Sequence, residues 1–74
     1  MGTMAIPDHT GHTAIDWRVD DPASLRRAGD TFTLLREQRL VPFARRTPAD
    51  EFEQIRRFDA QVDEIMWVRP LQGG

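Results

Sequence analysis

The chain has 74 residues, no cysteine and a formal net charge of −2, so it is one small domain without disulfides or thiolate zinc sites. The near-balance of 12 acidic and 10 basic residues gives no long-range attraction to nucleic acid or to an anionic membrane. No apolar run approaches the ~18 residues of a membrane span, and the N-terminus lacks the basic-then-apolar order of a secretory signal peptide. We therefore expect no membrane association and no secretion through a signal peptide.

The first segment, "MGTMAIPDHTGH", is residues 1–12 and holds only a short apolar patch from Met4 to Ile6. Its Gly, Pro and Asp residues predict either an N-terminal arm or a weak first strand, with "PDHTG" as a turn. The next stretch, "TAIDWRV", alternates apolar and polar residues and so predicts a half-buried strand. Its predicted inner face holds Thr13, Ile15, Trp17 and Val19.

A helix is predicted from "DDPASLRRAGDTFTLLREQRL". Asp21 can cap its N-terminus and Pro22 suits the first helical position, while the end is expected near residues 38–40. Apolar residues at spacings of three and four predict one buried stripe, which comprises Leu25, Ala28, Phe32 and Leu35. Gly29 lies inside the helix at a cost of roughly 1 kcal/mol relative to Ala, which suggests close packing on the sheet at that position.

Three further segments follow the helix. "LVPFAR" predicts an extended strand with Val41 and Phe43 on one side, and Pro42 places this strand at an edge or a break of the sheet. Residues 48–62 fit both a helical and a period-two pattern; we favour a strand followed by a short helical turn at "DAQVD" and leave the helix as the alternative. "EIMWVRP" predicts a last strand, with Ile65, Trp67 and Arg69 opposite Met66 and Val68.

The predicted fold class is α+β, with a single helix packed on a small sheet of about three to five strands. Residues 13–69 would form the domain. Residues 1–12 would be an N-terminal arm or weak first strand, and residues 70–74 a C-terminal Gly-Gly tail.

The residues that could carry chemistry are few. The chain has no Cys, Lys or Tyr, and its one serine, Ser24, lies in the first helical turn, where it supports the N-terminus. His9 and His12 are too few for a protein metal site. We therefore predict no enzyme, no cofactor and no metal.

All ten basic residues are arginine. Their pairs, such as Arg26-Arg27 and Arg56-Arg57, are interleaved with acidic residues, so nucleic-acid binding is not expected and protein contacts are favoured. Trp17 and Trp67 are predicted core residues, with an exposed interface anchor as the alternative for each.

The last residues, "DEIMWVRPLQGG", resemble the close of the β-grasp sulfur-carrier proteins, which are ubiquitin-like. The order of weak strand, strand, helix and three strands is similar to the β-grasp plan. In that family a partner enzyme adenylates the terminal glycine carboxylate. The resemblance implies that Gly74 would bear the chemistry, that Gly73 would give a thin tail, and that the partner would be an adenylating enzyme.

A second resemblance covers more of the chain. "IDWRVDDPASLRRAGDTF", "FDAQVDEIMWVRP" and the closing "GG" resemble small uncharacterised proteins of phage and prophage structural gene clusters. The matching positions are Trp17, Asp21-Pro22, Phe58-Asp59, Ile65 to Val68, Pro70 and Gly73-Gly74; Ala60 replaces a proline of that pattern. The resemblance implies a virion or host-cytoplasm location.

The expected function is that of a non-catalytic assembly protein, a small phage virion component associated with a capsid or connector in a multi-copy assembly. Its predicted partner-binding residues are Ile6 in the first arm and Trp67, Arg69 and Leu71 after the last strand. The alternatives are a ubiquitin-like carrier activated at Gly74 and a small phage-type regulator that binds a host protein.

Overall fold

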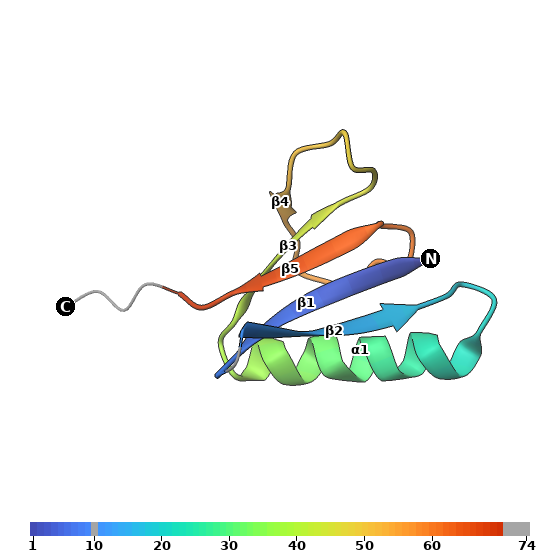
Figure 1. Cartoon of the computed structure of the whole chain (residues 1–74). Coiled ribbons are helices and arrows are strands. Elements are labelled where there is room, and N and C mark those ends of the chain that lie inside the picture. Colours follow the sequence, from blue (N-terminus) through green and yellow to red (C-terminus); the bar gives the residue numbers. More distant parts are fainter. Residues whose placement is uncertain (10, 71–74) are drawn as a thin grey trace.

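The computed structural model describes residues 1–9 and 11–70, which form one helix and a mixed sheet (Figure 1). The predicted α+β class is confirmed: a single helix packs on one face of a sheet of 5 strands. The elements in chain order are β1 (Gly2–Asp8), β2 (Gly11–Trp17), α1 (Pro22–Glu37), β3 (Val41–Arg45), β4 (Glu53–Gln54) and β5 (Glu64–Val68).

The strand order across the sheet is β2-β1-β5-β3-β4. β1 and β5 run parallel, and the other neighbouring pairs are antiparallel. The first strand is therefore paired on both sides, with β2 through all 7 of its residues and with β5 through Thr3, Met4 and Ala5. Residues 2–8 form a strand inside the sheet, so the arm alternative does not describe them.

The helix begins and ends where the sequence predicts. Asp21 is the N-cap, and its side chain accepts hydrogen bonds from the backbone N–H groups of Ala23 and Ser24 at 3.2 and 3.4 Å. Beyond Glu37 the chain reverses at Arg39, whose φ of 68° lies in the left-handed region. The Arg39 N–H donates to the Arg36 carbonyl at 2.9 Å, so the last turn is closed by backbone bonds.

The strand with Pro42 was predicted to lie at an edge or to carry a break. Both alternatives are wrong, because β3 lies between β5 and β4 and its pairing with β5 runs unbroken through Pro42. The physical reason is the direction of its backbone. The Pro42 carbonyl accepts from the Ile55 N–H at 3.1 Å, and in an extended strand the N–H of the same residue would point the same way. The backbone nitrogen of Pro42, which has no hydrogen to donate, therefore faces β4. All hydrogen bonds between β3 and β5 can still form.

The segment of uncertain type, residues 48–62, is largely irregular. Only Glu53 and Gln54 pair as a strand, opposite Ala44 and Phe43. The expected helical turn at "DAQVD" is a tight turn instead, because the Asp59 carboxylate accepts from the Gln61 N–H at 2.9 Å. Such a local side-chain bond offers the backbone an alternative to the helix.

The core lies between α1 and the sheet. Trp17, Met4 and Ile65 are among its fully buried side chains. The Trp17 Nε1–H donates to the Ala60 carbonyl at 3.1 Å, and its ring meets Phe58 edge-on at 5.1 Å. The core cluster comprises Met4, Trp17, Ala28, Phe32, Leu35, Ala44, Val62, Ile65 and Trp67.

Candidate functional site

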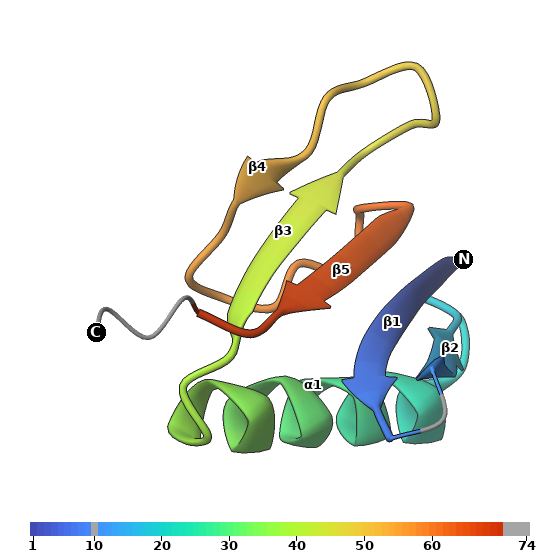
Figure 2. The same ribbon diagram turned by 60° about the vertical axis from the view of Figure 1, so that its left-hand side comes forward.

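The face of the sheet opposite α1 carries an apolar centre, which we call the outer patch. Figures 1 and 2 show α1 on one side of the sheet, and in the described part of the chain there is no second helix to cover the other side. The outer patch comprises Ala5, Val41, Phe43, Met66 and Val68. Because side chains alternate along a strand, these residues point away from their buried neighbours Met4, Pro42, Ala44, Ile65 and Trp67.

Strand register brings the outer patch together. Val41 pairs with Val68 and Phe43 with Met66 across β3 and β5, and Met66 also pairs with Ala5 of β1. Met66 and Val68 are 39% and 40% exposed, which is high for large apolar side chains in the middle of a sheet. The solvated face of a sheet is ordinarily polar, so a contiguous apolar centre marks a surface suited to a protein contact.

One end of the outer patch is closed by an ion pair. The Arg45 guanidinium donates from Nε and Nη2 to Oε1 of Glu64, at 3.1 and 2.8 Å. Arg45 also lies over the Phe52 ring, at 4.6 Å from its centroid. Both charges are satisfied within the chain, so this end holds its side chains in place and offers little net charge.

The opposite end carries two arginines that have no ion pair among the described residues. Arg69 follows Val68 directly, and Arg39 precedes Val41 by two residues. Both side chains are exposed. Since Val41 and Val68 pair with each other, the two arginines lie just beyond the same end of β3 and β5. This end therefore suits a partner that presents carboxylates beside an apolar surface.

Two of the predicted partner-binding residues lie elsewhere. Trp67 is 3% exposed and points toward α1: its Nε1–H donates to the Met4 sulfur at 3.4 Å, and its ring meets Phe32 at 4.9 Å. It is a core residue, and the anchor alternative is wrong for it because the strand alternation turns it inward. Ile6 is half-buried in β1 and packs against the core rather than in an arm.

The remaining predicted site residues divide into two groups. Arg69 is exposed and directly follows β5, and its partner-binding role stays a prediction. Leu71, Gly73 and Gly74 lie outside the described residues.

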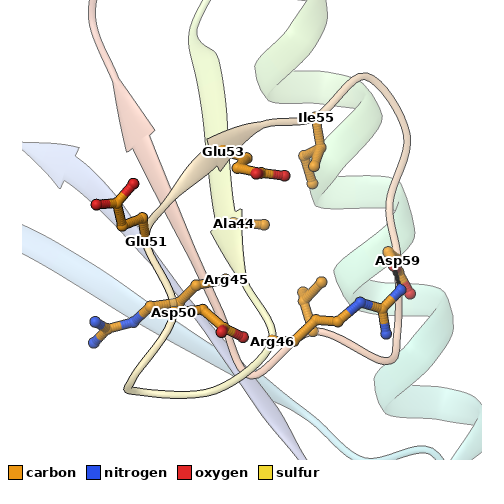
Figure 3. Close-up of a pocket in the computed structure, with 9 residues that line it drawn as sticks. Ala44, Arg45, Arg46, Asp50, Glu51, Glu53, Ile55 and Asp59 are labelled. Carbon is orange, nitrogen blue, oxygen red and sulfur yellow. Dashed lines mark hydrogen bonds and ion pairs between the residues drawn. The ribbon is translucent and has the colours of Figure 1, made fainter.

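A hollow with a volume of about 510 Å³ lies between the loop after β3 and the turn at residues 59–62 (Figure 3). Ala44, Ile55 and Val62 give it apolar walls. Its arginines are engaged: Arg46 reaches Asp59 at 3.3 Å, and Arg45 is paired with Glu64. Its lining residues include the carboxylates of Asp50, Glu51, Glu53 and Asp59 but no Ser, Thr, Cys, Lys or His.

The described residues hold few other reactive groups. Ser24 is buried, and its hydroxyl oxygen accepts from the Arg18 N–H at 2.9 Å. Its one proton lies within reach of the carbonyls of Asp21 and Arg18, at 2.9 and 3.2 Å, so the side chain joins the helix start to the end of β2. Within residues 1–9 and 11–70, no three His, Asp or Glu side chains are placed to hold a metal ion. No helix in this part of the chain is long and apolar enough to cross a membrane.

The outer patch was missed by the sequence analysis, although its signal is present. "EIMWV" is apolar at every position after Glu64, and such a run is typical of a strand with two apolar faces. The interface prediction named Trp67 because of its large ring, but Trp67 lies on the inner face of β5, and its neighbours Met66 and Val68 are the exposed residues.

Compared with known proteins, the chain matches no protein-family model, no curated protein and no solved structure.

Proposed function

We propose that this chain is a non-catalytic protein-binding module that joins an assembly through its outer patch. The observation that carries the proposal is the apolar centre of the sheet on the face that α1 leaves open, where Met66 and Val68 are exposed and Phe43 is half-buried beside them. Its partner is a protein surface with an apolar centre and with carboxylates at the edge that meets Arg39 and Arg69. The apolar contact would supply most of the affinity, and the charges would fix the orientation.

The backbone at Arg39 supports a role for its side chain. A φ of 68° is a position that favours glycine, and any L-residue with a Cβ is strained there by roughly 1 kcal/mol. Such strain persists where the surrounding structure holds it, and it is found at functional sites. A guanidinium beside the outer patch gives a physical reason for arginine at this position.

The virion location stays a prediction of the sequence resemblance. Two of the residues that carry it, Trp17 and Phe58, are in edge-to-face contact in the interior, and Asp21 caps α1. These three residues build the fold, whereas Met66 and Val68, which also belong to the resemblance, lie in the outer patch that would meet a partner.

The proposal is tested with two double variants of matched chemistry. Met66→Glu with Val68→Glu changes the outer patch; Val19→Glu with Leu34→Glu changes two apolar side chains that are each 52% exposed elsewhere. A partner is isolated with the wild-type chain, purified, and its Kd measured for all three proteins. We expect the outer-patch variant to bind at least about tenfold more weakly and the control to bind normally.

Three results would contradict the proposal. Equal weakening in both variants would mean that the contact lies elsewhere or that charge alone disturbs it. Unchanged binding in the outer-patch variant would exclude the patch. Wild-type self-association that only the outer-patch variant loses, as measured by sedimentation, would assign the patch to a second copy of this chain.

A carrier protein is the second candidate, and one observation favours it. The chain has the element order of the β-grasp plan, two strands, a helix and three strands, and the last strand lies in the middle of the sheet. This candidate requires that Gly74 bear the terminal carboxylate. An alanine added after Gly74 would abolish adenylation by a partner enzyme, measured as ATP–pyrophosphate exchange, and would leave binding through the outer patch unchanged.

A further inference from the structure

A second surface lies on the α1 side of the sheet, away from the outer patch. It is a groove with a volume of about 470 Å³ between the C-terminal half of α1 and residues 56–58, and we call it the arginine groove. Its apolar floor is made by Phe32 and Phe58. Its rim carries Arg36, Arg56 and Arg57.

The irregular backbone that carries Arg56 and Arg57 is held at both ends. On one side, the Ile55 N–H donates to the Pro42 carbonyl at 3.1 Å. On the other, the Phe58 ring packs edge-on against Trp17 at 5.1 Å and against Phe32 at 6.1 Å. The two arginines therefore sit on a short span between two fixed points, which lowers the entropy lost when they bind a ligand.

The three arginines of the groove have no ion pair within the described residues, in contrast to Arg18, Arg45 and Arg46, each of which meets a carboxylate. Glu37 is the one acidic side chain among the lining residues, so three positive charges face one negative charge. A planar guanidinium binds a carboxylate through two parallel hydrogen bonds, which gives the rim a preference for carboxylates.

The groove is a poor match for nucleic acid. Glu37 would repel a continuous phosphate backbone, and the chain as a whole is acidic. Phe32 is only 4% exposed and Phe58 is half-buried beside Trp17, so the floor lacks the row of exposed ring faces on which successive bases stack. The floor can instead receive an aliphatic side chain.

We propose that the arginine groove binds an acidic peptide segment of a second protein, in which glutamate or aspartate side chains alternate with aliphatic ones. The carboxylates meet Arg36, Arg56 and Arg57, and an aliphatic side chain lies on Phe58. Because α1 and the outer patch are on opposite faces of the sheet, both surfaces can be occupied at once. The chain would then join two proteins.

The test uses a synthetic peptide of alternating glutamate and leucine, titrated into the isotopically labelled full chain and followed by NMR. The same peptide with glutamine in place of glutamate is the ligand control. Two variants are compared. Arg56→Gln with Arg57→Gln changes the groove, and Arg26→Gln with Arg27→Gln changes an exposed adjacent pair near the other end of α1 that also has no ion pair with any described residue. Both remove the same charge.

We expect shifts confined to residues 32–37 and 55–58, roughly tenfold weaker binding to the Arg56/Arg57 variant, and near-normal binding to the Arg26/Arg27 variant. The glutamine peptide should not bind measurably. Equal losses in the two variants, or shifts spread along α1, would reduce the effect to general charge attraction and overturn the proposal. Tighter binding of a single-stranded oligonucleotide with the same dependence on Arg56 and Arg57 would also overturn it. Failure of this test leaves the outer-patch experiment unaffected, because the two use different residues.

Discussion

Phe43 and Met66 lie opposite each other across β3 and β5, on the face of the sheet that α1 leaves open. Their neighbours along the chain, Ala44 and Ile65, form the corresponding pair on the inner face, where both are buried. Apolar pairs thus occupy both faces of the same two strands. The inner pairs are accounted for by the core, and the outer pairs have no partner within the described chain. This difference is the basis of the proposed binding surface.

Gly2 and Gly29 provide a matched test of the packing. A Cβ on Gly2 would overlap the indole ring of Trp17, whereas a Cβ on Gly29 would have its nearest neighbour, Phe58, at 4.0 Å. We expect Gly2→Ala to lower the free energy of unfolding by about 1–3 kcal/mol through overpacking. Gly29→Ala should raise it by up to about 1 kcal/mol through helix propensity. Urea unfolding of both variants checks this, and a destabilised Gly29→Ala would refute the account of α1.

Trp67 and Arg69 separate folding from binding. Trp67 is buried against Met4 and Phe32, so Trp67→Ala should cost about 3–5 kcal/mol of stability. Arg69 is exposed, and Arg69→Ala should change stability by less than about 0.5 kcal/mol. Thermal unfolding measures both. A stable, folded Trp67→Ala protein that had lost its partner would restore Trp67 as a contact residue and contradict the core assignment.

Arg39 tests the strained position at the end of α1. Arg39→Gly should raise the free energy of unfolding by roughly 1 kcal/mol, because glycine adopts a φ of 68° without a Cβ penalty. Arg39→Ala keeps the Cβ and should leave stability nearly unchanged. Both variants lose the guanidinium, so both should weaken partner binding. Equal stabilities of the two variants in urea would show that no strain is present at this residue.

Two ion pairs of different exposure give a fourth prediction. The side chains of Arg45 and Glu64 are 26% and 28% exposed, whereas those of Arg18 and Asp20 are 65% and 69% exposed. A double-mutant cycle with Arg45→Gln and Glu64→Gln should give a coupling free energy of about 1 kcal/mol, and the Arg18–Asp20 cycle a value near zero. Similar coupling in both pairs would show that the Arg45–Glu64 contact does not fix the end of the outer patch.

Sequence periodicity predicted those elements that local chemistry determines. Asp21 and Pro22 define the start of α1, and the alternation of Ile65 and Trp67 with Met66 and Val68 defines β5. The position of β1 inside the sheet depends on its parallel pairing with β5, some sixty residues away along the chain, and no local pattern encodes such a pairing. For the same reason the short apolar patch from Met4 to Ile6 was compatible with an arm.

The candidate site was less predictable than the fold. The sequence analysis predicts Arg69 as a partner-binding residue, because arginine and tryptophan are common in protein interfaces and Arg69 follows Trp67 closely. The outer patch could not be predicted without the strand order, because Ala5, Met66 and Phe43 share one surface only when β1, β5 and β3 are neighbours. The arginine groove could not be predicted either, because it depends on the backbone course of residues 55–58, which form neither a helix nor a strand.

Site-specific photo-crosslinking tests the central claim most directly. A photoreactive phenylalanine analogue is placed at Met66 in the outer patch, or at Leu34, an exposed apolar position of α1 that serves as the control. The chain is then irradiated within its native assembly, and the crosslinked peptides are identified by mass spectrometry. The account predicts that the partner of the outer patch is crosslinked from Met66 and not from Leu34. Crosslinks to that partner from Leu34 but not from Met66 would show that the open face of the sheet is not the binding surface.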